Sequence, residues 1–200
     1  MTRRSLSFLA TLALLSTLTA CGGNKIDGAH SSTAATPSTS VAPRPLGSRP
    51  KDVSLKEVDP CQVLTDEQLQ QLRYSKTRRP DKGNRLDEPQ CSVGNSFGPP
   101  PNLSSLISLV VNEDISAWLT PERQGGLASS NKITVAGFPA LEMTGKRLKD
   151  DCQVVVDVAD GQYLDVFSTT ARERGTSPEP FCVEARRVAE MAVQTLLARS

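Results

Sequence analysis

Apolar side chains recur every three to four positions near the end of the chain, between residues 178 and 198. This spacing places them along one stripe of an α-helix and leaves the charged residues on its other sides, which is typical of a helix that packs on a sheet. We therefore predict a long C-terminal helix. Its apolar stripe consists of Phe181, Ala185, Val188, Ala189, Ala192 and Leu196.

Short apolar runs upstream of this helix predict β-strands. The clearest pair covers residues 152–159 and 162–169, which are separated by Asp160 and Gly161. Asp-Gly suits the two-residue type I′ turn of a β-hairpin. Further strands are predicted at 90–93, 103–111, 133–135 and 140–144.

Helix signals flank these strands. Asp59 followed by Pro60 is typical of an N-cap and a first helical turn, and Thr65 with Gln68 forms a capping-box pattern. A small helix is also expected around residues 115–124. Strands that cluster between terminal helices predict an α+β fold, in which an antiparallel β-sheet meander is packed by N-terminal and C-terminal helices.

The first 20 residues have the features of a signal peptide. Two arginines at positions 3 and 4 precede an apolar run at 6–18, which is shorter than the roughly 20 residues that a membrane-spanning helix needs. The sequence Leu-Thr-Ala-Cys at 18–21 resembles the bacterial lipobox. That resemblance implies cleavage before Cys21 and a diacylglyceryl group on its thiol, which would anchor the protein to a membrane.

Composition divides the remaining chain into two parts. Residues 21–54 are rich in Ser, Thr, Ala, Pro and Gly, which predicts a lipidated cysteine followed by a disordered stalk. Residues 55–200 have the length of a single domain. Without residues 1–20, 21 basic residues face 22 acidic ones, a balance that does not favour nucleic acid as a partner. We expect this domain on the extracytoplasmic face of the cell membrane.

The predicted domain contains an even number of cysteines: Cys61, Cys91, Cys152 and Cys182. In a chain exported to an oxidising compartment, this number predicts two disulfides. Four cysteines can pair in three ways. Pairing Cys61 with Cys91 and Cys152 with Cys182 is favoured, because each pair is then separated by 30 residues. A metal or redox site is disfavoured, because the domain has no Cys-x-x-Cys pair and the single histidine, His30, belongs to the stalk.

Several of these segments resemble actinobacterial lipoproteins that share a domain of unknown function. The likeness rests on the Val-Asp-Pro-Cys start at 58–61, the cysteine framework, and the segments at 135–140 and 152–156. Such proteins often carry Cys-x-Trp at the second cysteine, whereas here Val93 stands in place of the tryptophan. The resemblance implies an envelope protein without an established activity, and a layered fold like that of PsbP-like proteins, which mostly bind partners.

Residues 55–200 contain no histidine. The domain therefore cannot have a Ser-His-Asp or Cys-His catalytic site or a metal site with histidine ligands. Carboxylates remain as a candidate general acid and base: Asp150, Asp151, Asp157 and Asp165. A two-residue turn pairs Asp165 with Val156 on a face shared by Val154 and Val158. If that face is the core, Asp165 is buried and needs a partner; a bulge or an exposed face is the alternative.

Two other features are candidates for binding. The basic stretch 73–85, which includes Arg78 and Arg79, could meet anionic headgroups or wall polymers, although such runs are usually solvated loops. Trp118 could line the edge of a pocket, although core packing is the more common role of a tryptophan.

These observations favour a non-catalytic binding or interaction module of the cell envelope, with a lipid anchor and without a cofactor or metal. Its partner would be an envelope protein, a lipid or a wall polymer. One alternative is a carboxylate-dependent envelope enzyme, which requires two of the four aspartates to face one cleft. Another is an accessory lipoprotein that docks on a transporter or a signalling receptor.

Overall fold

The computed structural model describes residues 44–75, 78–83, 88–95, 102–147, 150–170 and 177–200, which belong to one compact unit of the chain. Its strands are β1 (Arg79–Lys82), β2 (Pro89–Gly94), β3 (Leu103–Val110), β4 (Leu127–Val135), β5 (Phe138–Gly145), β6 (Asp151–Ala159) and β7 (Gln162–Thr170). Its helices are α1 (Asp66–Gln71), α2 (Pro121–Gln124), α3 (Glu179–Arg199) and the short 3₁₀ turns η1 (Pro60–Gln62) and η2 (Ile115–Leu119).

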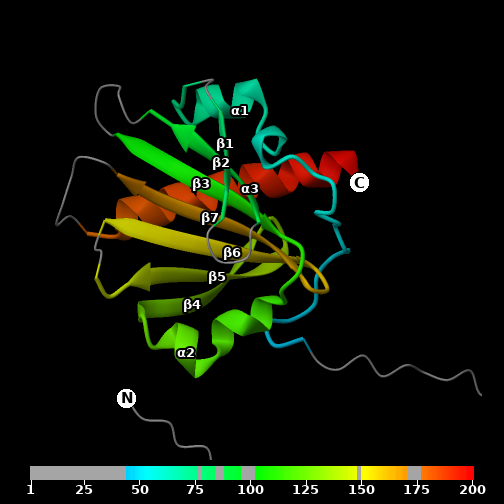
Figure 1. Cartoon of the computed structure of the whole chain (residues 1–200), viewed down its shortest axis with the longest axis vertical. Helices are drawn as coiled ribbons and strands as arrows, with labels where there is room; N and C mark the ends of the chain where they lie inside the picture. The colour runs from blue at the N-terminus through cyan, green and yellow to red at the C-terminus, as the bar shows by residue number, and fades with distance from the viewer. Residues whose placement is uncertain (1–43, 76–77, 84–87, 96–101, 148–149, 171–176) are drawn as a thin grey trace, which may run out of the picture. The chain divides into compact units, whose positions relative to one another are not determined.

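All seven strands form one antiparallel sheet in the order β1-β2-β3-β7-β6-β5-β4. The sheet therefore consists of two meanders, which meet where β3 pairs with β7. Helix α3 packs across β6 and β7 on one face of the sheet (Figure 1). The predicted α+β class, with an antiparallel sheet packed by terminal helices, is confirmed.

Local hydrogen bonds explain where the first helices begin. The Asp59 carboxylate accepts a hydrogen bond from the backbone N–H of Cys61 at 2.8 Å and starts η1. In the predicted capping box, the backbone N–H of Gln68 donates to the Thr65 hydroxyl, and the N–H of Thr65 donates to the Gln68 side chain. These contacts satisfy N–H groups that a helix start would leave unpaired.

Apolar side chains gather on both faces of the sheet. The larger cluster lies between the sheet and α3 and includes the whole predicted stripe of that helix. A smaller cluster on the opposite face contains Val110, Ile115, Leu141, Met143, Val155 and Tyr163. Trp118 and Leu119 pack against this second cluster, so η2 covers part of the second face.

Both disulfides join the cysteines that the spacing favours. Cys61 is bonded to Cys91, and Cys152 is bonded to Cys182, each across 30 residues. The first bond connects η1 to β2, and the second connects β6 to the first turn of α3. Each therefore ties a helical segment to the sheet.

The β6–β7 hairpin contains a β-bulge, one of the alternatives that the sequence left open for Asp165. Its register shifts between Asp157 and Ala159, so Asp165 pairs with Val155 rather than with Val156. The extra residue is Val158, whose side chain belongs to the main core. Asp165 instead lies on the face away from α3, because its neighbours Leu164 and Val166 point into the main core.

The segment before η1 packs on this same hairpin. The backbone N–H of Val53 donates to the carbonyl of Val158 at 2.8 Å, and the N–H of Leu55 donates to the Gln162 side chain at 2.8 Å. The side chains of Val53 and Leu55 are buried. The domain therefore takes in residues 44–54, which composition alone assigns to the stalk.

Strand β1, which belongs to the basic stretch, is not predicted by the sequence pattern. All four of its residues are exposed, so no alternation of apolar and polar positions marks it. Its backbone pairs with β2 along the edge of the sheet.

Among the described residues, no helix combines the length and apolar character that crossing a membrane requires.

Candidate functional site

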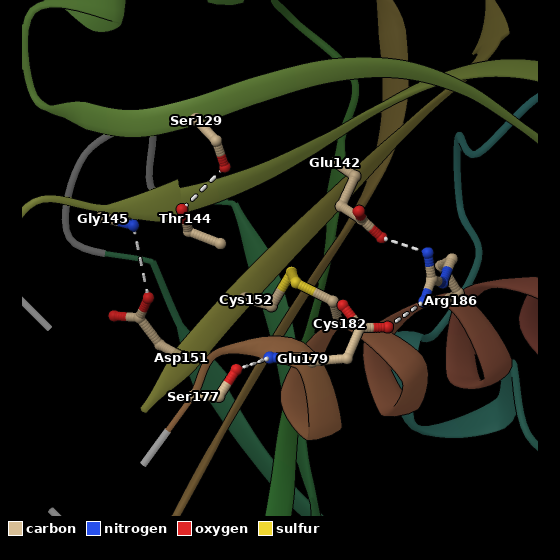
Figure 2. The surroundings of a disulfide bond; sticks show 10 residues. All are labelled: Ser129, Glu142, Thr144, Gly145, Asp151, Cys152, Ser177, Glu179, Cys182 and Arg186. Carbon is tan, nitrogen blue, oxygen red and sulfur yellow. Dashed lines mark hydrogen bonds and ion pairs between the residues drawn. A yellow bond between two sulfur atoms is a disulfide. The ribbon is translucent and has the colours of Figure 1, made fainter. Parts of the chain in front are cut away.

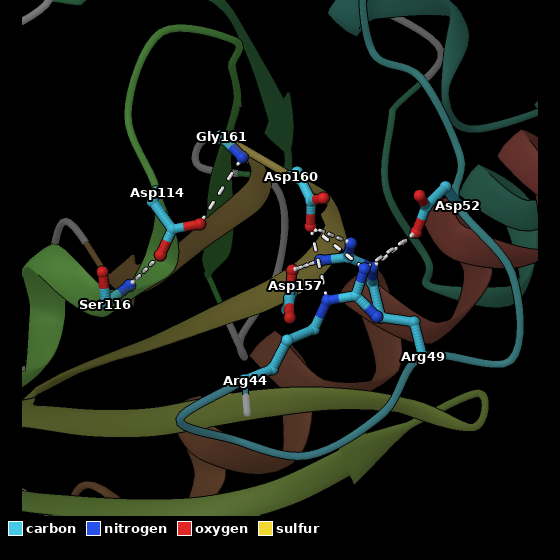
Figure 3. Close-up of polar contacts among 8 residues, drawn as sticks. All are labelled: Arg44, Arg49, Asp52, Asp114, Ser116, Asp157, Asp160 and Gly161. Atoms are coloured by element: carbon cyan, nitrogen blue, oxygen red, sulfur yellow. Dashed lines mark hydrogen bonds and ion pairs between the residues drawn. The ribbon is translucent and has the colours of Figure 1, made fainter. Parts of the chain in front are cut away.

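A cluster of charged side chains fastens residues 44–52 to the turn between β6 and β7 (Figure 3). At its centre is Arg49, whose side chain is only 1% exposed. Its Nε donates to Asp52 at 2.8 Å, its Nη2 donates to Asp160 at 2.5 Å, and its Nη1 donates to the buried Asp157. We call the group of Arg44, Arg49, Asp52, Asp157 and Asp160 the Arg49 cluster.

Arg44 completes the outer side of the cluster. Its guanidinium donates to Asp160 at 3.1 and 3.3 Å, and its side chain is 29% exposed. Next to it, Lys132 of β4 donates to the carbonyl of Pro45 at 3.1 Å. The start of the described chain is thus held both to the turn between β6 and β7 and to strand β4.

The pKa values in this cluster follow from its contacts. Hydrogen bonds from Arg49 and Arg44 lower the pKa of Asp160, whereas burial raises the pKa of Asp157 against the opposing effect of Arg49. Asp114 lies beside the hairpin turn, and its hydrogen bond with Ser116 lowers its pKa. The Arg49 cluster is thus a set of mutually paired charges, an arrangement suited to holding two chain segments together.

The four aspartates proposed as acid and base lie in different surroundings. Asp157 belongs to the Arg49 cluster, and Asp165 accepts hydrogen bonds of 2.8 and 2.7 Å from the Gln153 side chain. Asp165 does not lie on the face of Val154 and Val158, the position expected for a regular hairpin, because β6 contains the bulge that was the alternative. The half-buried Asp165 is therefore not a core carboxylate.

Asp151 has a third environment. It accepts a hydrogen bond of 3.4 Å from the backbone N–H of Gly145 (Figure 2), and burial, with a smaller contribution from the charge of Asp150, raises its pKa. It also lines a surface pocket of about 460 Å³ together with Lys146 and Arg147. Within the described residues, Asp150 and Asp151 are near each other, but Asp157 and Asp165 lie in separate groups.

The basic stretch contributes to the domain itself. Arg78 donates to the carbonyl of Leu64 at 3.1 Å and to the Asp66 carboxylate at 2.7 Å, whereas Arg79 is exposed on β1. Lys76 and Arg85 lie outside the described residues. Arg78, directly before β1, thus contacts the start of α1, and Arg79 is the member of the pair that faces solvent.

Replacing Arg78 with alanine should therefore lower the free energy of unfolding by about 1 kcal/mol, because a charged hydrogen bond and a backbone contact are lost on a partly exposed side chain. Arg79→Ala should change it by no more than about 0.5 kcal/mol. Urea denaturation of the two variants measures both values. Equal losses would contradict the different contacts of the two arginines.

Trp118 packs among charged and aromatic neighbours on the second face. The guanidinium of Arg123 lies 4.5 Å from the centre of its ring. Arg123 also donates to Glu113 at 2.6 and 2.7 Å, and the Tyr163 hydroxyl donates to Glu113 at 2.5 Å. These contacts give Trp118 a packing role, as the more common interpretation of a tryptophan predicts.

A carboxylate also lies close to the second disulfide (Figure 2). Glu142 faces the bonded Cys152 and Cys182, and its Oε2 lies 3.1 Å from Nη1 of Arg186. The two sulfur atoms are bonded to each other, so they are not thiolates that could bind a metal ion. This group therefore holds α3 on the sheet by a covalent bond and an ion pair.

Two buried polar groups are not predicted by the sequence pattern. Arg49 lies in the segment that composition assigned to the stalk, and nothing in the local pattern reveals its buried partners. Glu184 is buried on α3, three residues after Phe181 and four before Val188. Those separations place Glu184 on the predicted apolar stripe of the helix. A carboxylate on that stripe indicates a buried charged group, which the sequence alone could have revealed.

Comparison with known proteins gives one broad result. Residues 16–195 match the model of a protein family whose description is 'protein of unknown function (DUF3558)'. No curated protein and no solved structure matches the chain.

Proposed function

We propose that this chain, which belongs to the DUF3558 family of proteins of unknown function, is a lipid-anchored, non-catalytic binding module displayed on the extracytoplasmic face of the cell membrane. The anchor in this proposal is Cys21, and the displayed part is the disulfide-bonded domain. The signal peptide, Cys21 and the stalk up to residue 43 lie outside the described residues.

The main support for this proposal is that the four cysteines of the domain are paired in disulfides and the fifth stands in the lipobox-like sequence. The sequence contains five cysteines, and the four in the domain form two disulfides. Disulfides persist in oxidising compartments, which supports export of the chain. The fifth cysteine is Cys21, which stands at the position that the lipobox pattern requires.

The surroundings of the acidic side chains favour binding over catalysis. Asp157 and Asp160 are ion-paired with arginine, and Asp165 is held by Gln153. A general acid or base needs a carboxylate that can exchange protons with a substrate, and these three are already bonded within the domain. The carboxylate-dependent enzyme remains the alternative, with Asp151 as the residue to test.

Replacing Cys21 with serine tests the anchor. The unaltered protein should incorporate a fatty-acid probe in growing cells and fractionate with membranes, whereas the Cys21→Ser variant should incorporate none and leave the membrane fraction after mild washing. A Ser32→Ala variant in the predicted stalk serves as the control and should behave as the unaltered protein. Equal labelling of the two cysteine forms would contradict the proposal.

Crosslinking in intact cells tests the binding role. A photo-crosslinking residue at Val183, which is 48% exposed on α3, reports what lies against that face. Repeated capture of one membrane protein would favour an accessory lipoprotein that docks on a transporter or receptor. Turnover of an envelope substrate that is lost in an Asp151→Asn variant would contradict a non-catalytic role.

A further inference from the structure

A small pocket lies between the end of α1, the neighbouring ends of β2 and β3, and α3. Its volume is about 190 Å³. This is below the roughly 300–1,000 Å³ of pockets that take drug-sized ligands, so an occupant must be small. The lining residues are Leu72, Arg73, Tyr74, Asn95, Leu103, Glu184 and Arg187.

Glu184 is the unusual member of this lining. The residue is only 6% exposed, and its Oε1 is enclosed without a hydrogen-bond partner among the described residues. Burial raises its pKa more than the facing Tyr74 hydroxyl and the charge of Arg187 lower it. A buried carboxylate oxygen without a donor is costly, and a ligand that brings a donor would remove that cost.

Hydroxyl groups continue the polar lining into the domain. The Tyr74 hydroxyl lies 2.9 Å from the Ser105 hydroxyl, which in turn lies 2.8 Å from that of Ser168. All three residues are buried, and burial is the main cause that raises the pKa of Tyr74. This row of hydroxyls holds the Tyr74 phenol in place beside the Glu184 carboxylate.

Positive charge lies at the exposed side of the same pocket. Arg73 and Arg187 are both exposed, and Arg187 is positioned by a 2.8 Å hydrogen bond to the carbonyl of Gln71. Arg73 follows the last turn of α1 with a φ of 58°, at the position of a helix end where glycine is preferred. A long cationic side chain thus occupies a position that glycine would fill with less strain.

We propose that this pocket binds a small zwitterion of the α-amino-acid class. Its ammonium group would donate to the Glu184 carboxylate, and its carboxylate would meet Arg73 and Arg187. A simple cation would be repelled by the two arginines, and a simple anion would face the buried carboxylate. A ligand that carries both charges matches both the Glu184 side and the arginine side of the pocket. This inference does not depend on lipidation of Cys21.

Titration of the purified protein with small probes tests the charge requirement. L-Alanine, D-alanine and glycine are the zwitterions, while ethylamine and propionate each carry one of the two charged groups. Amide chemical shifts of residues that line the pocket should move with at least one zwitterion at up to about 10 mM, and the single-charge probes should bind at least about tenfold more weakly. Equal binding of propionate or ethylamine, or no shifts with any zwitterion, would overturn the proposal.

Three variants separate binding from folding. Glu184→Gln keeps the size of the side chain, should remain folded, and should weaken zwitterion binding at least about tenfold. Arg73→Gly suits the backbone conformation and should also weaken binding without loss of stability. Glu190→Gln, at an exposed position on α3, is the matched control and should bind as the unaltered protein does. Undiminished binding by Glu184→Gln would overturn the proposal.

The pH dependence follows from the raised pKa of Glu184. Only the ionised carboxylate pairs with an ammonium group, so affinity should rise as the pH increases through the pKa of Glu184. Tyr74, Arg73 and Arg187 are the other ionisable side chains that line this pocket, and burial raises the pKa of Tyr74 further above the range in which a carboxylate titrates. The rise should be absent in Glu184→Gln, and its persistence there would contradict the assigned role.

Discussion

Replacing Arg49 with alanine should lower the free energy of unfolding by about 3–5 kcal/mol. The variant leaves Asp157 buried without its cation, and Asp160 loses its 2.5 Å contact. An uncompensated buried carboxylate is much more costly than an absent ion pair. Urea denaturation followed by circular dichroism measures the loss.

Arg44 supplies the control for this prediction. It belongs to the same cluster and contacts the same Asp160, but its side chain is 29% exposed. Arg44→Ala should therefore cost less than about 1 kcal/mol. Limited proteolysis should also show faster cleavage within residues 44–55 in Arg49→Ala than in Arg44→Ala. Similar stabilities of the two variants would contradict the central position of Arg49.

Removing the bond between Cys152 and Cys182 should have the second largest effect. A double substitution to alanine should lower the free energy of unfolding by about 3.5 kcal/mol, because the unfolded chain regains the entropy of an open loop of 30 residues. The loss should also loosen α3, since this bond joins its first turn to β6. Thermal denaturation in the absence of reducing agent measures the change.

The other disulfide provides a comparison of equal loop length. Cys61→Ala with Cys91→Ala opens a loop of the same 30 residues and should cost a similar amount if loop entropy dominates. Hydrogen exchange should separate the two double variants, with faster exchange in α3 only when its own bond is removed. A variant lacking the bond to α3 that melts like the unaltered protein would contradict the stabilising role.

Regular local patterns made much of the fold predictable. The α3 stripe repeats over several turns, and Thr65 with Gln68 marks a helix start; both appear in the structure. Asp160 and Gly161 form the two-residue connection of the hairpin, as predicted, but the predicted type I′ conformation is wrong, because only Gly161 has a positive φ and type I′ needs one at both positions. The disulfide pairing followed from equal spacing. Each of these features depends on residues close in sequence or on a simple count, which a single sequence contains.

Features that depend on long-range contacts were not predictable in the same way. The position of the extra residue in β6 is one example: Val158 accepts a hydrogen bond from the backbone N–H of Val53, in the distant segment before η1. The burial of Arg49 depends on aspartates more than 100 positions away. The pairing of β3 with β7 likewise joins distant segments. Composition and periodicity describe neighbours in sequence, so they do not contain this information.

The mass of the N-terminal peptide is the most direct test of the proposed anchor. Protein isolated from the membranes of its own cells would be digested and its first peptide identified by mass spectrometry. We predict a peptide that begins at Cys21 and carries the added mass of a diacylglyceryl group. A peptide that extends into residues 1–20, or an unmodified Cys21, would contradict the account.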